Sequence, residues 1–481
     1  MPEYRPTIGL EVHAELKTRT KMFCDSLNDP DEKHPNVNVC PVCLGHPGTL
    51  PVPNRQAIEQ VIKVGLALGG APNARSKFDR KNYFYPDLPK AYQISQSGQP
   101  LVLGGALRGI KLNHIHLEED AGKLVHDDAA KAGGGPGDGT LVDYNRAGVP
   151  LMELVTEPDI HSAGDAVAFM KELQLVLRYL GVSDADLERG QMRADANISV
   201  SATGKLGTRA EVKNLNSFNS VFQAVNYEIK RQTEVLEKGE TVCQETRGWD
   251  DVKQRTMPQR SKEEAQDYRY FPEPDIPPFE TAAFGIEALR DSLPELPDAK
   301  RARFAKEYGL DAGQAEILVG EPPLANYFEE AVSELAGRGV KNYGTLFNYL
   351  TSDLRGLMNQ AGTVFGDLKV SPEHLARLAA LIEGKKVTSR QAKDILARMF
   401  GTGADPEEIV KSESIGVSED FGEIEAAVTA VIAENKSAAD DYRKGKTASM
   451  QFLIGQAMRI LKGRARPEML REMFEKALAA E

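Results

Sequence analysis

The first residues of the chain alternate strictly between apolar and polar side chains. Apolar residues occupy positions 8, 10, 12, 14 and 16, and Glu11, His13 and Glu15 fall between them. Such alternation predicts a β-strand with one buried face, on which side chains two positions apart point the same way. Glu11 and His13 therefore share a face. A carboxylate beside an imidazole is typical of a metal or acid–base site, and a solvated strand face is the alternative.

The remaining pattern predicts a β-rich first part and a helical second part. Alternating segments over 114–120, 193–200 and 209–213 predict further strands, and helical spacing of apolar residues predicts a helix over 165–180. Because strands outnumber connecting helices, we predict an α+β fold with a largely antiparallel sheet. Prolines between positions 272 and 297 indicate a linker. After them, amphipathic runs predict helices over 372–383, 389–399, 424–435 and 448–461.

Chain length and composition predict several domains of a globular protein. The 481 residues exceed one ordinary core. We expect three domains, at 1–290, 291–405 and 406–481, with a Gly/Asp/Pro stretch before the last. The chain has no run of about 18 apolar residues, so we expect no membrane span. No segment resembles a targeting peptide. Four cysteines in a chain of this length argue against a disulfide framework. We therefore expect a cytoplasmic protein.

Charge is distributed unevenly along the sequence. The net charge of −12 disfavours indiscriminate coating of nucleic acid. From residue 441 onward, however, nine basic and five acidic residues give a local excess of +4. This basic end favours a local nucleic-acid contact.

Two later segments add carboxylates to the opening pair. Glu118 lies in an alternating segment that also contains His114 and His116, and Glu153 lies between Met152 and Leu154. An acid inside an apolar run is costly unless it is paired or bound to metal. A buried ion pair of Glu153 with Arg146 or Arg193 is one alternative. The other is an oxygen-rich pocket for Mg²⁺, with phosphate oxygens as further ligands, formed by Glu11, His13, Glu118 and Glu153.

Three other segments contain candidate substrate contacts. Arg193, Asp195 and Asn197 share one predicted strand face, where Arg can clamp a carboxylate or phosphate and Asp and Asn can bind hydroxyl or amine groups. Segments 77–90 and 267–271 interleave cations with aromatic rings, as in proteins that hold unpaired nucleotides. The alternatives are a polar sheet face with ion pairs and surface loops with packed aromatics.

Three cysteines form a possible zinc site. Cys24, Cys40 and Cys43 include one C-x-x-C spacing, and a closed zinc site needs four ligands. The fourth ligand could come from Asp25, His34 or His46.

Long ordered motifs are spread along the chain. One runs from Val142 to Glu153 and contains Asn145, Arg146, Gly148 and Pro150. Further motifs lie at 9–13, 80–87, 117–122, 195–199, 213–218 and 268–275. Together they resemble the motifs of the B subunits of the glutamyl/aspartyl-tRNA amidotransferases, over essentially the whole chain.

This resemblance implies a fold and an activity. The first domain would be a cradle with a twisted antiparallel sheet, similar to glutamine synthetase and guanido kinases, followed by a helical domain and a YqeY-like helical tail. The protein would bind ATP and Mg²⁺ and phosphorylate the side-chain carboxylate of glutamate or aspartate mischarged on tRNA. Ammonia would then displace the phosphate, which makes the enzyme a carbon–nitrogen ligase with glutamine as the amido donor.

The resemblance also assigns residues. The metal and catalytic positions fall on Glu11, His13, Glu118 and Glu153. In zinc-binding family members C-x-C precedes C-x-x-C, whereas here Ser26 replaces the second cysteine, so zinc at Cys24, Cys40 and Cys43 departs from the pattern. Contacts to substrate or ATP are expected from Arg80, Lys81, Asn145, Arg146, Arg193, Asp195 and Asn197. Contacts to tRNA are expected from Arg443, Lys444, Lys446, Arg464 and Arg466.

The chain shows no glutaminase signature, so ammonia would come from partners. The resemblance implies an amidase partner, the A subunit of such enzymes, and a small C subunit that holds the assembly together. Two competing hypotheses are a tRNA-binding scaffold without a phosphoryl site, and a metal-dependent hydrolase or nuclease that uses the same carboxylates without ATP.

Overall fold

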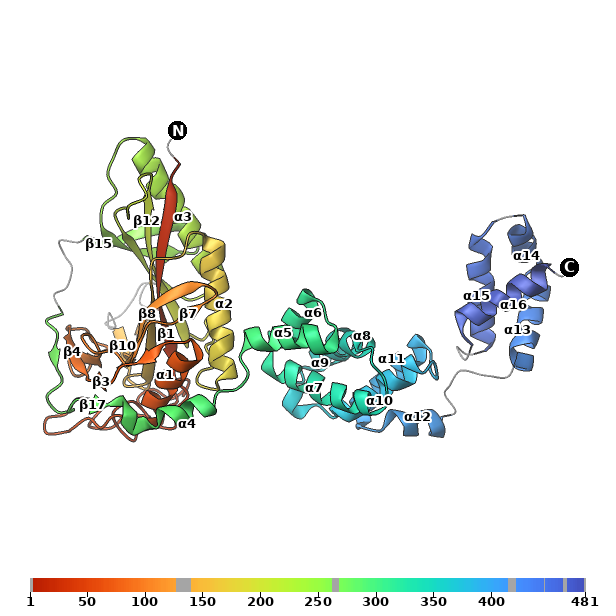
Figure 1. The fold of residues 1–481 in the computed structure, drawn as a ribbon, viewed down its shortest axis with the longest axis horizontal. Coiled ribbons are helices and arrows are strands. Elements are labelled where there is room, and N and C mark those ends of the chain that lie inside the picture. The colour runs from red at the N-terminus through yellow and green to blue at the C-terminus, as the bar shows by residue number, and fades with distance from the viewer. Residues whose placement is uncertain are drawn as a thin grey trace, which may run out of the picture. The chain divides into compact units, whose positions relative to one another are not determined.

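The computed structural model describes residues 3–126, 140–261, 268–413, 421–444, 446–461 and 465–479. The chain divides into two compact units, residues 1–297 and 298–481, which are shown in Figure 1. Among the described residues, unit 1 contains the strands together with four α-helices, and unit 2 is helical. The expected α+β class with a helical second part is confirmed.

A large mixed sheet forms the framework of unit 1. Its strands run in the order β15-β14-β13-β12-β1-β11-β8-β6-β2, with β7 also paired to β8. All these pairings are antiparallel except that of β13 with β14. The strand bounds are β1 Arg5–Glu15, β2 Ala71–Pro72, β6 Val102–Leu103, β7 Ala106–Leu107, β8 Ile110–Glu119, β11 Pro150–Thr156, β12 Met192–Ser201, β13 Ala210–Leu215, β14 Glu245–Asp250 and β15 Arg255–Ser261.

The alternation of side chains divides this sheet into an apolar and a polar face. Leu10, Val12 and Ala14 of β1 are fully buried in the core, together with Phe169 and Leu173 of α2. Figure 1 shows the long helices α2 and α3 lying along one side of the strands. The helices of this unit are α1 Arg55–Ala67, α2 Ala163–Tyr179, α3 Phe218–Glu237 and α4 Ile286–Asp291. Because the helices bury the apolar face, the polar side chains of β1, β8, β11 and β12 share the other.

Short strands add smaller sheets to unit 1. One contains β16 Phe271–Pro272, β4 Asp79–Asn82 and β5 Tyr92–Ser95, and another pairs β17 Phe279–Glu280 with β3 Arg75–Ser76. The proline-rich segment expected as a linker therefore begins as part of unit 1, because β16 and β17 pair with strands far earlier in the sequence. A two-stranded sheet joins β9 Lys123–His126 to β10 Thr140–Asp143.

Unit 2 is formed by helices with apolar faces. Thr388 caps α11 in a capping box with Gln391, and Ser371 caps α10. The π-helical turn η4 Tyr349–Leu354 separates α8 from α9. The helix bounds are α5 Pro297–Tyr308, α6 Ala312–Val319, α7 Pro322–Gly337, α8 Gly344–Asn348, α9 Arg355–Ala361, α10 Pro372–Glu383, α11 Ser389–Thr402 and α12 Pro406–Ser412.

Four helices at the C-terminal end have a core of their own. Ile424, Val431, Leu453 and Phe474 are among its fully buried residues. The helices are α13 Phe421–Glu434, α14 Lys436–Arg443, α15 Ala448–Ile460 and α16 Pro467–Ala479. Within the described residues, no helix is both long and apolar enough to cross a membrane.

Candidate functional site

Strand register brings four polar residues into one row across the polar face of the main sheet. His13 of β1 pairs with Glu153 of β11 on one side and with Arg193 of β12 on the other. Glu153 in turn pairs with His116 of β8. Paired residues point to the same face of a sheet. The row therefore reads His116, Glu153, His13, Arg193, and Glu118 lies two positions beyond His116 on the same face.

His13, Glu118 and Glu153 form a compact group. His13 Nε2 lies 3.2 Å from Glu153 Oε2 and 3.8 Å from Glu118 Oε1. One ligand atom from each of the three residues lies within 4.8 Å of the other two. The Ser95 hydroxyl donates a hydrogen bond of 3.0 Å to Glu118 Oε2. Two carboxylates and an imidazole at this spacing are a donor set suited to a divalent cation.

Buried charges of opposite sign balance the group. Burial alone would raise the pKa of Glu153, but the neighbouring imidazoles of His116 and His13 lower it well below its usual range. Burial would likewise raise the pKa of Glu118, and His116 and Lys81 lower it. Burial would lower the pKa of His116, but Glu153 and Glu118 raise it to about 10. Both glutamates are therefore anionic and available as ligands at neutral pH.

Glu11 lies beside this group but belongs to a second one. One ligand atom each of Glu11, Asp195 and Glu211 lies within 4.8 Å of the other two. Asn197 Nδ2 donates to Glu11 Oε1 at 2.9 Å, and burial followed by the Glu153 charge raises the pKa of Glu11. Lys213 Nζ lies 2.7 Å from Asp195 and 2.9 Å from Glu211. The four expected ligands thus share one sheet face, three in one group and Glu11 in the next.

The two arginines expected near Glu153 pair with Asp120 instead. Arg193 Nη2 lies 3.2 Å from Asp120 Oδ1, and Arg146 Nε lies 3.6 Å from Asp120 Oδ2. Arg146 also donates to the carbonyl oxygens of Ala121 and Gly122, at 3.0 Å each. The ion-pair alternative for Glu153 is therefore wrong, because its partners are the two imidazoles. Nothing in the sequence around residues 114–120 indicated that Asp120 would pair with both arginines.

Arg80, Lys81 and Asn145 have different surroundings. Arg80 makes a bidentate ion pair with buried Glu273, at 2.6 and 2.8 Å, and stacks on the Tyr92 ring. Asn145 is buried and holds loop backbone, donating to the His34 carbonyl at 2.8 Å. Lys81 Nζ has no hydrogen-bond partner among the described residues and lies 5.1 Å from the centre of the Tyr268 ring. Its pKa, which burial would lower, is raised above its usual range by the charge of Glu118.

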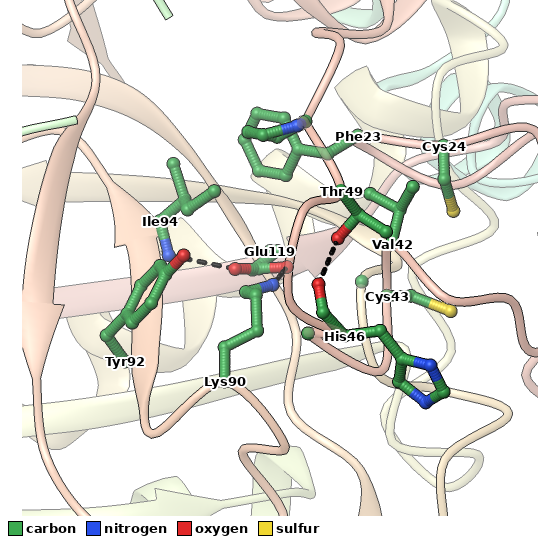
Figure 2. Close-up of a pocket in the computed structure, with 13 residues that line it drawn as sticks. Phe23, Cys24, Val42, Cys43, His46, Thr49, Lys90, Tyr92, Ile94 and Glu119 are labelled. Carbon is green, nitrogen blue, oxygen red and sulfur yellow. Dashed lines mark hydrogen bonds and ion pairs between the residues drawn. The ribbon is translucent and has the colours of Figure 1, made fainter. Parts of the chain in front are cut away.

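A pocket lies behind β8, on the face opposite the cation group. Figure 2 shows Lys90 reaching the carboxylate of Glu119, with the sulfur atoms of Cys24 and Cys43 to the right in this view. Lys90 Nζ lies 2.5 Å from Glu119 Oε2, and the Ile94 amide donates to Glu119 Oε1 at 2.9 Å. Neighbouring residues of a strand point to opposite faces, so Glu118 and Glu119 face the two different sites.

The three expected cysteines converge beside this pocket. Their sulfur atoms lie within 4.8 Å of one another, and the Cys40–Cys43 distance is 3.8 Å. Buried Lys21 places Nζ 4.0 Å from Cys43 Sγ. A hydrogen bond from Cys24, together with the Lys21 charge, lowers the pKa of Cys43 to about 5. His46 lines the pocket, whereas His34 is exposed and pairs with Glu32.

The expected tRNA contacts lie on or beside α14 to α16. Arg443 and Lys446 pair with Asp440 and Asp441, at 3.3 and 3.1 Å. Lys444 follows α14 and is exposed, and Arg466 is half-buried with Nε in the interior. Arg464 lies outside the described residues.

Comparisons with known proteins point to one family. Residues 6–286 match the family described as the GatB/GatE catalytic domain, and residues 326–478 match the one described as the GatB domain. The aspartyl/glutamyl-tRNA(Asn/Gln) amidotransferase B subunit of Carboxydothermus hydrogenoformans is 44% identical over 489 residues, covering 100% of both chains. Proteins of the same name from Thermus thermophilus and Myxococcus xanthus are 46% and 45% identical, covering 99% of each chain.

Proposed function

Because the chain belongs to the GatB family of aspartyl/glutamyl-tRNA amidotransferase subunits, we propose that it converts mischarged Glu-tRNA(Gln) or Asp-tRNA(Asn) to the amide form. The group His13, Glu118 and Glu153 is the observation that carries this proposal. It lies within the part of the chain that matches the catalytic domain. The protein acts first as a kinase on the side-chain carboxylate and then as a transamidase.

The chemistry explains why a phosphoryl-transfer site is needed. A carboxylate resists attack by ammonia because oxide is a very poor leaving group. Transfer of the γ-phosphoryl group of ATP to a carboxylate oxygen forms an acyl phosphate and releases ADP. Ammonia then attacks the acyl carbon, and inorganic phosphate leaves with the oxygen it received. Such transfers need positioning and charge neutralisation more than a protein nucleophile.

Mg²⁺ fits the donor set of the polar face. His13, Glu118 and Glu153 would hold one ion, and Glu11 lies beside them for a shared or second one. When bound, the ion supplies positive charge that neutralises phosphate oxygens. An acyl phosphate hydrolyses in water, so the reaction requires that water is excluded while the intermediate exists.

Lys81 is the cation that we assign to the phosphates of ATP. Its Nζ is available for a ligand, and it lies close enough to Glu118 and Glu153 for their charges to act on its pKa. Arg193, Asp195 and Asn197 lie on the same sheet face, and Arg146 joins Arg193 at Asp120 from the loop before β11; we assign all four to substrate contact. Arg80 and Asn145 are engaged in internal hydrogen bonds, so we assign them to holding the walls of the site.

The C-terminal helices bind tRNA in this proposal. Exposed Lys444 and Lys446, together with Arg443, Arg464 and Arg466, supply the positive charge for phosphate contacts. In this proposal residues 406–481 form a tail domain, after a cradle of residues 1–290 and a helical domain of residues 291–405, and the separate buried core of α13 to α16 supports this division.

Further elements of the proposal concern partners and metal. A glutaminase, the A subunit, supplies ammonia and a small C subunit joins the two, which fits a family whose members are named as subunits. The assembly works in the cytoplasm. Cys24, Cys40 and Cys43 offer three sulfur ligands for zinc, one fewer than a closed site needs, and the Lys21 ammonium beside Cys43 would compete with a metal ion there.

The test is formation of ADP by the assembled subunits with mischarged tRNA and Mg²⁺. We expect Glu153→Gln to lower this rate by about 100-fold or more, because the variant removes one negative ligand from the cation group. Glu157→Gln is the matched control, since Glu157 follows β11 and bonds Asn113 away from the group. Full ADP formation in Glu153→Gln, with its fold intact by circular dichroism, would overturn the assignment.

A further inference from the structure

Two imidazoles approach one oxygen of Glu153. His13 Nε2 lies 3.2 Å and His116 Nε2 lies 3.3 Å from Glu153 Oε2. The histidines come from β1 and β8, the two strands that flank β11. His116 Nε2 also lies 3.8 Å from Glu118 Oε2. His116 therefore touches both carboxylates of the cation group from one atom.

The ring of His116 is held in place by its surroundings. His116 is 6% exposed, and its ring stacks on that of His114 with centroids 5.2 Å apart and planes 24° apart. Its Nδ1 is buried and has no hydrogen-bond partner among the described residues. The polar contacts of the ring are thus made through Nε2, toward Glu153 and Glu118.

We propose that His116 is a positioning residue that fixes the carboxylates of Glu153 and Glu118 so that they converge with His13 on one divalent cation. This inference rests on the cation site of the proposed function. Side chains that contact metal ligands without binding the metal set ligand orientation, and replacing them weakens metal affinity by about 10- to 100-fold.

We assign His116 to positioning because it lies outside the group of mutually close ligand atoms. The ligand atoms that lie within 4.8 Å of one another come from His13, Glu118 and Glu153, and His116 is not among them. His13 and His116 stand on opposite sides of β11. His116 Nε2 lies as close to the two carboxylates as His13 Nε2 does, so the substitutions below separate positioning from ligation.

The proposal predicts different effects for three substitutions. Glutamine can place an amide nitrogen near the position of Nε2, asparagine is too short to do so, and leucine offers no donor. In the full-length protein, His116→Leu and His116→Asn should weaken Mn²⁺ binding by about 10- to 100-fold. His116→Gln should stay within about threefold of the wild type, because it keeps the contact that the proposal invokes.

The affinity of each variant for Mn²⁺ is measured from the electron paramagnetic resonance signal of the free ion. This measurement does not depend on enzyme activity. His114→Phe is the matched control, because it keeps an aromatic ring stacked on His116, and His114 has no ion pair with either carboxylate among the described residues. It should bind Mn²⁺ as the wild type does. Loss of Mn²⁺ binding in Glu153→Gln would show that the ion measured is the one bound by His13, Glu118 and Glu153.

Each other result has a definite meaning. Unchanged affinity in His116→Leu and His116→Asn would overturn the positioning role, as would tighter binding, which would make His116 a competing countercharge. Equal loss in all three variants would make His116 a ligand or a purely structural residue. If His116→Leu fails to fold, the asparagine and glutamine pair still decides. Wild-type affinity in Glu153→Gln would instead reject the cation site of the proposed function.

Discussion

Glu153 and His13 contact each other across two paired strands, with His13 Nε2 3.2 Å from Glu153 Oε2. Because an isolated carboxylate is costly at this burial, Glu153 requires a polar partner at this position. The contact places the Glu153 carboxylate on the polar face of the sheet, where the Glu118 carboxylate also lies near His13. This contact defines the centre of the proposed phosphoryl-transfer site, and the predictions below test the elements around it.

Acid should destabilise unit 1 through His114. Burial, and secondarily the His116 charge, lowers the pKa of His114 to about 4 from its ordinary value of 6.5. Between these pH values the unfolded chain binds a proton at this group that the folded chain does not. The free energy of unfolding therefore falls as pH drops from about 6.5 to 4. His114→Gln should show a shallower fall in urea unfolding over this range, and identical slopes would contradict the assignment.

Two glycine-to-alanine substitutions should have opposite effects on stability. Alanine usually stabilises a helix over glycine by about 0.5–1 kcal/mol. At Gly65 in α1, however, an added Cβ would lie 2.5 Å from a methyl group of Val102. Gly65→Ala should therefore lower the free energy of unfolding by about 1–3 kcal/mol.

Gly455 in α15 is the matched site, because an added Cβ there would have no atom within 4 Å apart from its chain neighbours and the backbone of its own helix. Gly455→Ala should raise stability by about 0.5–1 kcal/mol. Denaturant midpoints for the two units measure both changes. A stabilising Gly65→Ala would mean that α1 and β6 are not packed as described.

The cysteine group should bind a tetrahedral metal ion. Co²⁺ added to the reduced full-length protein should give an intense thiolate charge-transfer band in the near ultraviolet, since three sulfur atoms lie within 4.8 Å of one another. Cys43→Ala should lose the band. Cys243→Ser should keep it, because Cys243 is an exposed free cysteine outside the group. A band of equal strength in both variants, or none in the wild type, would argue against the site.

The basic tail should account for part of the salt dependence of tRNA binding. We expect a chain ending at residue 413 to bind tRNA more weakly and with a flatter slope of log affinity against log salt, because fewer phosphates are neutralised. The cut falls after α12, which is tied to α7 through the ion pair of Arg338 with Glu407. Filter binding at several salt concentrations measures the slope. An unchanged affinity and slope would assign the tail another role.

Local patterns predicted much of the fold. Strands β1, β8 and β12 follow from alternation, and α10 begins and ends where the amphipathic run predicts it, at Pro372 and Glu383. These signals are short-range, because strand and helix periods are properties of neighbouring residues. The apolar face of β1 likewise followed from Leu10, Val12 and Ala14.

The contacts within the site depend on which strands pair with each other, and a local sequence pattern does not contain that information. The alternation placed Glu11 and His13 on one face, but only the pairing of β1 with β12 and of β12 with β13 puts Glu11 beside Asp195 and Glu211. Arg80 looked available for a phosphate, yet its partner Glu273 lies 193 positions away. His116 was visible in the same alternation as Glu118, and its contact with Glu153 depends on strand register.

The most direct test of the central claim follows one oxygen atom. Mischarged tRNA with ¹⁸O in its side-chain carboxylate is incubated with ATP, Mg²⁺, ammonium and the assembled subunits. If His13, Glu118 and Glu153 serve formation of an acyl phosphate, the label appears in inorganic phosphate as the amide forms, and Glu153→Gln abolishes this transfer. Amide formation with unlabelled phosphate would contradict the account.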